Sequence, residues 1–154
     1  MNPHTHTVRY YETDKMAITH HSNYIRWMEE ARMELLKSIG YGMKRLEAEG
    51  ITSPVVSLEC RYRRPTTFDD EIAVRVTVEK YSGVKLELSY VMTDTATGDV
   101  VFTARSGHCF IDEEGHPVVI KKRAPAFDEL LRRELIIEKE ALSVFRIDKP
   151  GPVR

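Results

Sequence analysis

The 154-residue sequence has little of what would mark a protein for export, for a membrane or for a nucleic acid. Its start has no basic stretch followed by an apolar one, and no apolar run approaches the ~20 residues that a membrane helix needs. Its 23 basic and 24 acidic side chains leave a formal net charge of -1, so no bulk field attracts nucleic acid or an anionic membrane. We therefore expect a cytoplasmic protein that binds neither.

Cysteine is also scarce. Cys60 and Cys109 have no paired-ligand spacing around them, and each lies in a stretch that predicts a strand. This argues against a disulfide framework and favours buried thiols in a reducing compartment. The histidines near residue 20 lack a cysteine or carboxylate at metal-ligand spacing, so we expect no metal and no other cofactor.

The pattern of apolar residues predicts one long helix early in the chain. Apolar side chains recur every three or four positions over residues 23–39, directly after Ser22 and Asn23, which are good N-cap residues. Gly40 then supplies the residue expected just past a helix end. Two further helices are expected, over residues 43–49 and, opened by a proline, over about 125–142.

From Val55 onward the apolar period changes to two, which predicts strands with one apolar face. In the first of these strands Val56, Leu58 and Cys60 share a face, so we expect it to be half-buried. The Ser82-Gly83 turn predicts an antiparallel hairpin. The strands are expected over residues 4–10, 55–63, 72–78, 84–92, 100–111 and 118–120.

The order of these elements, one strand, one long helix and then consecutive antiparallel strands, predicts an α+β domain. A helix with a wide apolar stripe and strands with one apolar face bury each other best when the sheet wraps around the helix. We expect this single domain to cover residues 1–145, followed by a tail over residues 146–154.

The segment from Tyr10 to Tyr24 resembles the active-site segment of hotdog-fold acyl-CoA thioesterases of the 4-hydroxybenzoyl-CoA thioesterase type. In that family a tyrosine ends a strand, a Thr-Asp pair follows, and seven positions later a histidine or aromatic residue enters an Asn-Tyr helix start. Here Thr13-Asp14, His21 and Asn23-Tyr24 fill these places. The resemblance covers most of residues 7–120 and includes Tyr62-x-x-Pro65, Asp69-Asp70 and the pattern from Ala104 to Gly115.

The resemblance implies a hotdog fold and the hydrolysis of an acyl-CoA thioester to free acid and coenzyme A. It implies that Asp14 is the nucleophile or the general base, and that the backbone N–H of His21 polarises the thioester carbonyl. Elementary electrostatics agrees, because unpaired N–H groups and partial positive charge collect at a helix N-terminus. The other residues expected in the site are Tyr10 in catalysis, and Asn23, Trp27, Arg63 and Arg64 in substrate binding.

Several alternatives stay open at this point. Tyr10 and Trp27 could fill the core instead, the His21 imidazole need not take part, and Arg63 and Arg64 could be solvated charges at a sheet margin. Many relatives carry glycine at the position of Ala17, where the loop turns, and alanine tolerates fewer backbone conformations.

Two other functions compete with hydrolysis. One is a hotdog hydratase or dehydratase, although the Asn-x-Asp spacing and the His-x-x-x-x-Pro-Gly element of those enzymes are missing. The other is a non-catalytic acyl-CoA binding module. In each case we expect a homodimer or homotetramer, because one such sheet leaves a strand edge and part of the site open.

Overall fold

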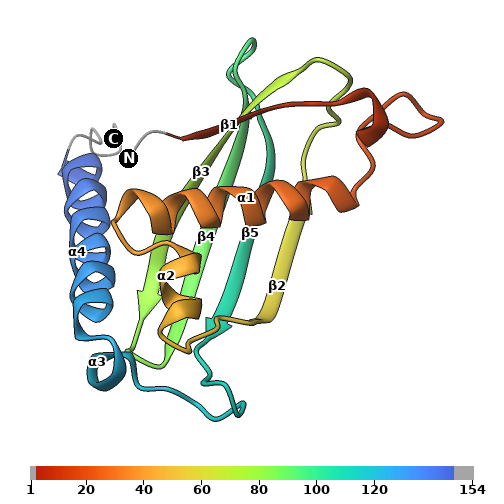
Figure 1. Ribbon diagram of the computed structural model, residues 1–154. Helices are drawn as coiled ribbons and strands as arrows, with labels where there is room; N and C mark the ends of the chain where they lie inside the picture. Colours follow the sequence, from red (N-terminus) through yellow and green to blue (C-terminus); the bar gives the residue numbers. More distant parts are fainter. Residues whose placement is uncertain (1–2, 148–154) are drawn as a thin grey trace.

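The computed structural model describes residues 3–147, and of residues 142–147 only the backbone. An antiparallel sheet with the strand order β1-β3-β4-β5-β2 wraps around helix α1 (Figure 1). This confirms the α+β architecture and the hairpin at Ser82-Gly83, where β3 pairs with β4. The strands are β1 His4–Thr7, β2 Val55–Tyr62, β3 Glu71–Tyr81, β4 Lys85–Asp94 and β5 Val100–Cys109.

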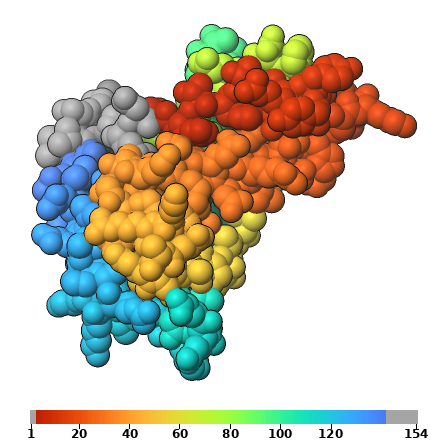
Figure 2. All heavy atoms as spheres, viewed as in Figure 1, coloured from red at the N-terminus to blue at the C-terminus, as the bar shows by residue number. Residues whose placement is uncertain are grey.

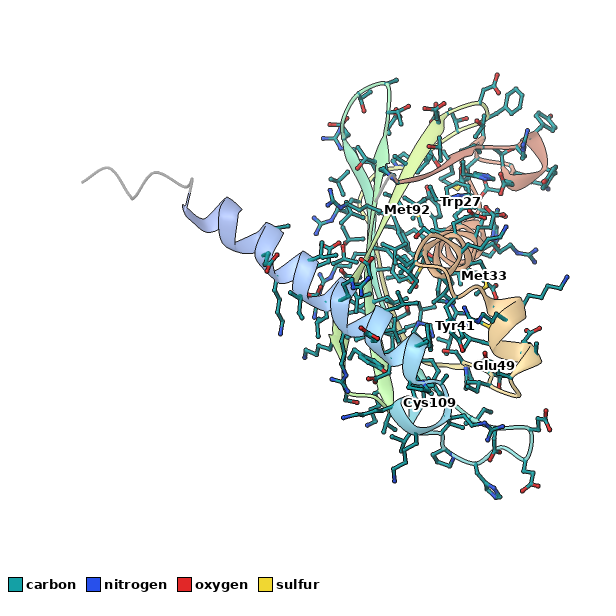
Figure 3. The ribbon with its side chains drawn as sticks, turned by 60° about the vertical axis from the view of Figure 1, so that its left-hand side comes forward. Trp27, Met33, Tyr41, Glu49, Met92 and Cys109 are labelled. Atoms are coloured by element: carbon teal, nitrogen blue, oxygen red, sulfur yellow. The ribbon has the colours of Figure 1, made fainter. Side chains whose placement is uncertain are left out.

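Helix α1 fills the inside of the curved sheet. Its buried side chains recur at three- and four-residue steps, as the sequence pattern predicts. Trp27 of α1 and Met92 of β4 are both fully buried (labelled in Figure 3). The helices are α1 Ser22–Ser38, α2 Met43–Ala48, α3 Ile120–Arg123 and α4 Pro125–Ile147, and Tyr10–Glu12 form a 3-10 turn.

The beginning of α1 differs from the prediction. His21, not Ser22 or Asn23, occupies the N-cap position, and its side chain makes no capping hydrogen bond. The Asn23 side chain instead donates to the backbone carbonyl oxygens of Glu12 at 2.9 Å and His20 at 3.2 Å. Its polar group therefore braces the preceding loop rather than the helix end.

The strand predicted over residues 4–10 ends earlier, at Thr7. The chain then turns, because the Arg9 backbone N–H donates to Glu12 Oε1 at 2.8 Å instead of to a neighbouring strand. This side-chain acceptor competes with strand pairing. As a result, the Glu12 carboxylate is brought under the loop that precedes α1.

The prediction of a last strand over residues 118–120 is wrong. Pairing there is limited to an isolated bridge between Ile111 and Pro117, and Ile120 begins α3. Pro117 has no N–H to continue a ladder, and the Ile120 N–H donates to the Gly83 carbonyl oxygen at 2.9 Å.

Helix α4 is longer than predicted. Its first half packs on the body through the buried Phe127 and Leu131, and its second half projects away from the body (Figure 3). The helix continues to Ile147, so the boundary predicted at residue 145 falls inside it. Residues 148–154 of the predicted tail lie outside the described residues.

Strand β2 is more exposed than predicted. It lies at the edge of the sheet, and every one of its residues except Cys60 is exposed. The pairing with β5 also shifts between Val55 and Ser57, which puts Val55, rather than Val56, on the face that Leu58 occupies. The chain alone therefore leaves one side of β2 and its apolar side chains without cover.

Candidate active site

The loop between the 3-10 turn and α1 is closed by its own backbone. The Asp14 N–H donates to the Ile18 carbonyl oxygen at 2.9 Å, and the Ala17 N–H donates to the Asp14 carbonyl oxygen at 3.0 Å. Ala17 has a φ of 62°, in the left-handed region that favours glycine. This conformation gives a physical reason for glycine at this position in relatives. Thr67 holds the turn from outside by donating to the Ala17 carbonyl oxygen at 2.7 Å.

Asp14 lies exposed in this loop. Its Oδ1 accepts a hydrogen bond from the Met16 backbone N–H at 2.8 Å, which fixes the direction of the side chain. In the described part of the chain no donor contacts the other carboxylate oxygen. That oxygen is free to meet a substrate or a water molecule.

Glu12 is the buried support of the loop, and the sequence analysis missed it. Its side chain is 5% exposed and accepts hydrogen bonds from the backbone N–H of Arg9 at 2.8 Å and the Trp27 indole N–H at 2.8 Å. His6 Nε2 lies 2.7 Å from the same carboxylate. Burial raises the pKa of Glu12, but the bonds from Arg9, His6 and Trp27 outweigh burial and leave that pKa below its usual value.

The start of α1 presents a free backbone donor. Within residues 3–147 no acceptor contacts the His21 backbone N–H, while the His21 carbonyl oxygen accepts a hydrogen bond from the Tyr62 hydroxyl at 2.9 Å. The latter bond joins the end of β2 to the beginning of the helix. A free N–H at the positive end of a 17-residue helix is suited to hold a developing negative charge.

A cavity of about 410 Å³ opens where the loop, the helix start and the end of β2 meet. In Figure 2 the N-terminal segment runs over α1 and projects beyond it at this end. The cavity collects four of the residues predicted from the sequence: Asp14, His21, Arg63 and Arg64.

The other three predicted residues lie elsewhere. Tyr10 is exposed, and its ring meets the edge of Phe68 at a centroid distance of 5.7 Å. Trp27 is in the core, bonded to Glu12, and Asn23 braces the loop backbone. None of the three lines the cavity. Nothing in the sequence distinguishes them from residues that do, because the motif gives their order but not the direction of their side chains.

The two arginines differ in their partners. Arg64 Nη1 lies 3.2 Å from Asp99 Oδ2 in an exposed ion pair. Arg63 Nε donates to Thr103 Oγ1 at 3.4 Å, and no carboxylate among the described residues lies within 4.0 Å of it. Arg63 therefore has the more available positive charge at the cavity.

Over the described residues 3–147, no group of three or more His, Cys, Asp or Glu side chains is arranged to hold a metal ion. In the same range, no helix is long and apolar enough to cross a membrane.

A sheet wrapped around one long helix is the hotdog fold. The model of the Thioesterase-like superfamily matches residues 8–135, and the chain belongs to this superfamily. The predicted family and fold are thereby confirmed, and the chain is a thioester hydrolase.

Named relatives agree with this assignment. YneP of Bacillus subtilis (strain 168), named as a candidate acyl-CoA thioesterase, is 35% identical over 119 residues, which are 77% of this chain and 86% of YneP. The long-chain acyl-CoA thioesterase FadM of Escherichia coli (strain K12) is 29% identical over 97 residues, 63% of this chain and 73% of FadM. The structure of a DHNA-CoA thioesterase from Staphylococcus aureus superposes with a TM-score of 0.86 at 27% identity, covering 91% of this chain and 94% of that one.

Proposed function

We propose that the protein hydrolyses acyl-CoA thioesters to a free acid and coenzyme A, with Asp14 as the reacting carboxylate. The observation that carries this proposal is that Asp14 and the free backbone N–H of His21 meet at one cavity. The acyl-CoA thioesterases among the relatives support coenzyme A as the thiol half of the substrate.

In the proposed reaction the thioester carbonyl oxygen accepts a hydrogen bond from the His21 N–H. As the carbonyl carbon becomes tetrahedral, the negative charge on this oxygen is stabilised by the N–H and the helix dipole. Asp14 either attacks the carbon or takes a proton from a water molecule that attacks it. Direct attack expels the thiolate and leaves a mixed anhydride, which water then cleaves to the acid and free Asp14. In the other route the tetrahedral carbon formed by the attack of water expels the thiolate and gives the acid directly, and the thiolate takes up the proton that Asp14 removed.

The same scheme accounts for the arginines and requires no cofactor. We propose that Arg63, which has no carboxylate partner in the described part of the chain, contacts the phosphates of coenzyme A, with Arg64 in a weaker role because Asp99 already pairs with it. No step needs a metal ion, so treatment with EDTA should leave the rate unchanged. Loss of activity in EDTA and recovery with zinc would contradict this part of the proposal.

The test is Asp14→Asn, which keeps the shape of the side chain but removes its charge and basicity. We expect kcat to fall by roughly 10²- to 10⁴-fold, as for the loss of a positioned acid–base group, with substrate binding and melting temperature retained. The matched control is Asp94→Asn, since Asp94 Oδ1 likewise accepts a hydrogen bond from a backbone N–H, that of Ala96 at 2.9 Å, away from the cavity.

Free thiol release from a panel of acyl-CoAs, in single-turnover experiments, is the measurement. Retained turnover within about threefold in folded Asp14→Asn would remove Asp14 from the mechanism. Changes in the acyl chain without thiol release would indicate a hydratase, and binding with neither change would indicate a binding module.

We further propose that the working form is a homodimer or homotetramer, in which a second copy covers the exposed edge of β2. Support comes from the unpaired backbone of this strand and the exposed Val55, Val56 and Leu58 on it. Light scattering should give at least twice the mass of one chain. A single-chain mass at micromolar concentration would contradict this proposal.

A cytoplasmic location is part of the same proposal. It is supported by Cys60 and Cys109, which are free and half-buried, because a reducing compartment keeps such thiols unpaired. Cell fractionation with a tagged chain would test it.

A further inference from the structure

A second cavity, of about 270 Å³, lies between α1 and β2, one helical turn beyond the first. Its walls are apolar except for Glu29 and come from the helix and from the edge strand. For scale, an apolar cavity of ~150 Å³ accommodates benzene. The apolar wall residues are Ile25, Met28, Val55 and Leu58.

The floor of this cavity is polar and consists of one chain of hydrogen bonds across three elements. Arg32 Nη1 of α1 lies 2.9 Å from His108 Nδ1 of β5. His108 Nε2 lies 2.7 Å from Ser106 Oγ, which lies 2.8 Å from the Tyr90 hydroxyl of β4. All four side chains are buried and all four line the cavity.

The protons in this chain can be counted. Arginine only donates, so His108 Nδ1 is the acceptor, and a neutral imidazole then donates from Nε2 to Ser106. Ser106 and Tyr90 each carry one hydroxyl proton, and only one of the two can lie in the bond between them. Whichever proton lies in that bond, the other has no acceptor among the described residues, and both residues line the cavity.

Arg32 has unused donors as well. A guanidinium has five N–H groups, and both acceptors found for Arg32, His108 and the Ser53 carbonyl oxygen at 3.2 Å, contact Nη1. No carboxylate in the described part of the chain lies within 4.0 Å of Arg32, including Glu29 on the cavity wall. Among the described residues, every side-chain nitrogen that is fully buried has a hydrogen-bond partner. The Arg32 nitrogens without a partner therefore remain accessible to solvent.

Arg32 is thus a cation that is 7% exposed, lines a largely apolar cavity and has no anionic partner among the described residues. A buried charge without a counter-charge is costly, and a protein rarely keeps one unless something pairs with it. The free hydroxyl proton of the Ser106–Tyr90 pair, which lies on the other side of the His108 ring from Arg32, would donate to the same ligand. Together they form a site for an anionic oxygen, which a carboxylate fits best because it accepts two guanidinium N–H bonds side by side.

We propose that this cavity receives the far end of the acyl group and that the preferred substrates carry a carboxylate there. The proposal rests on thioester cleavage at the start of α1. Arg32 lies three turns beyond His21, about 16 Å along the helix axis, and helical side chains lean back toward the N-terminus. An acyl group of medium length would therefore place its thioester at His21 and its carboxylate at Arg32.

The test compares straight-chain acyl-CoAs with the ω-carboxylated acyl-CoAs of the same carbon number: hexanoyl with hexanedioyl, octanoyl with octanedioyl, and decanoyl with decanedioyl. For the best-fitting length, we expect kcat/KM to be at least about tenfold higher for the carboxylated member. The reason is that one hydrogen bond to a charged group stabilises a complex by a free energy equivalent to a factor of roughly 10 to 100 in affinity.

Two variants locate the effect, and in each the readout is the ratio of kcat/KM for the carboxylated member to kcat/KM for the plain member. Tyr90→Phe keeps the ring and should reduce this ratio about tenfold, and Arg32→Gln should abolish the preference. Tyr81→Phe is the matched control, because Tyr81 is also a buried strand tyrosine but bonds to Asp128, away from this cavity. Thermal melting verifies that each variant is folded, and Tyr90→Phe alone suffices if Arg32→Gln does not fold.

The outcomes separate this proposal from the proposed function. Equal rates for both members of every pair, or an equal loss on both in the variants, would overturn the carboxylate site while hydrolysis stands. If wild type hydrolyses none of these acyl-CoAs, the binding affinities of the same pairs are measured by calorimetry to test the carboxylate site. Tighter binding of the carboxylated member, lost in Tyr90→Phe, supports the site without the reaction, and equal binding overturns it.

Discussion

The buried histidine beneath the second cavity makes a specific prediction for the pH dependence of stability. Burial, with the Arg32 cation beside the ring, lowers the pKa of His108 from 6.5 to about 4. The groups that face His108 are Arg32 from α1 and Ser106 from β5, with Tyr90 and Glu29 on the same cavity. We predict that His108 is neutral in the folded protein throughout the range in which it gains a proton in the unfolded chain.

The sign and size of the effect follow from that difference. Between pH 6.5 and about pH 4 the unfolded chain binds a proton at His108 that the folded chain does not, so the folded state loses stability as the pH falls. One pKa unit corresponds to ~1.36 kcal/mol, so His108 should account for about 3 kcal/mol over this range. The loss levels off as the pH falls through about 4, because the folded chain then binds the same proton.

Urea unfolding at fixed protein concentration, in steps from pH 6.5 to about pH 4, measures this effect in wild type and in His108→Gln. The glutamine can accept from Arg32 and donate to Ser106 but cannot be protonated, so its stability profile should be flatter by about 3 kcal/mol. His116→Gln, at an exposed loop histidine, is the control. Parallel profiles for wild type and His108→Gln would refute the reasoning, whatever their absolute stabilities.

Three further predictions concern the first cavity. Glu12→Gln should lower the free energy of unfolding by about 2–4 kcal/mol and also reduce kcat, because a buried carboxylate with several donors is lost. In the same urea unfolding experiment the control Glu30→Gln, at an exposed position, should change the free energy of unfolding little. Ala17→Gly should retain activity and stabilise the fold by up to about 1 kcal/mol, since glycine adopts the left-handed φ of 62° without strain. The melting temperature should therefore rise, and a lower melting temperature would contradict this. Arg63→Ala should raise KM for acyl-CoA more than it lowers kcat, and by more than Arg64→Ala does; an unchanged KM in steady-state assays would leave both as edge charges.

Much of the architecture could be predicted from the sequence because it depends on periodicity. The three- and four-residue spacing of α1 and the alternation in β3 to β5 are repeated many times, so single exceptions do not change the result. The errors occur where a single local contact determines whether a strand continues or forms. The bond from the Arg9 N–H to Glu12 ends β1, and Pro117 prevents the last strand, and neither effect has a period.

The candidate site shows the same division. The motif identified Asp14 and His21, which the structure brings to one cavity, because the loop and helix start that hold them are adjacent in sequence. Tyr10, Asn23 and Trp27 belong to the same segment, but their side chains point elsewhere. Direction depends on partners distant in the chain, such as the contact of Tyr10 with Phe68, and a single sequence does not contain that information.

The motif missed two buried charged residues, Glu12 and Arg32. Their partners differ, and this difference distinguishes a structural role for Glu12 from a ligand-binding role for Arg32. Glu12 accepts from two N–H groups and meets His6, so its charge is compensated within the chain. Arg32 contacts two neutral acceptors and no carboxylate among the described residues, so the proposed ligand would supply its compensation. Removing a compensated charge leaves buried donors without partners, whereas removing an uncompensated one relieves a desolvation cost. Arg32→Gln should therefore destabilise the fold by less than Glu12→Gln in urea unfolding of the two variants, although Arg32 has the longer side chain. The reverse order would mean that Arg32 is a structural residue and would weaken the case for a ligand at the second cavity.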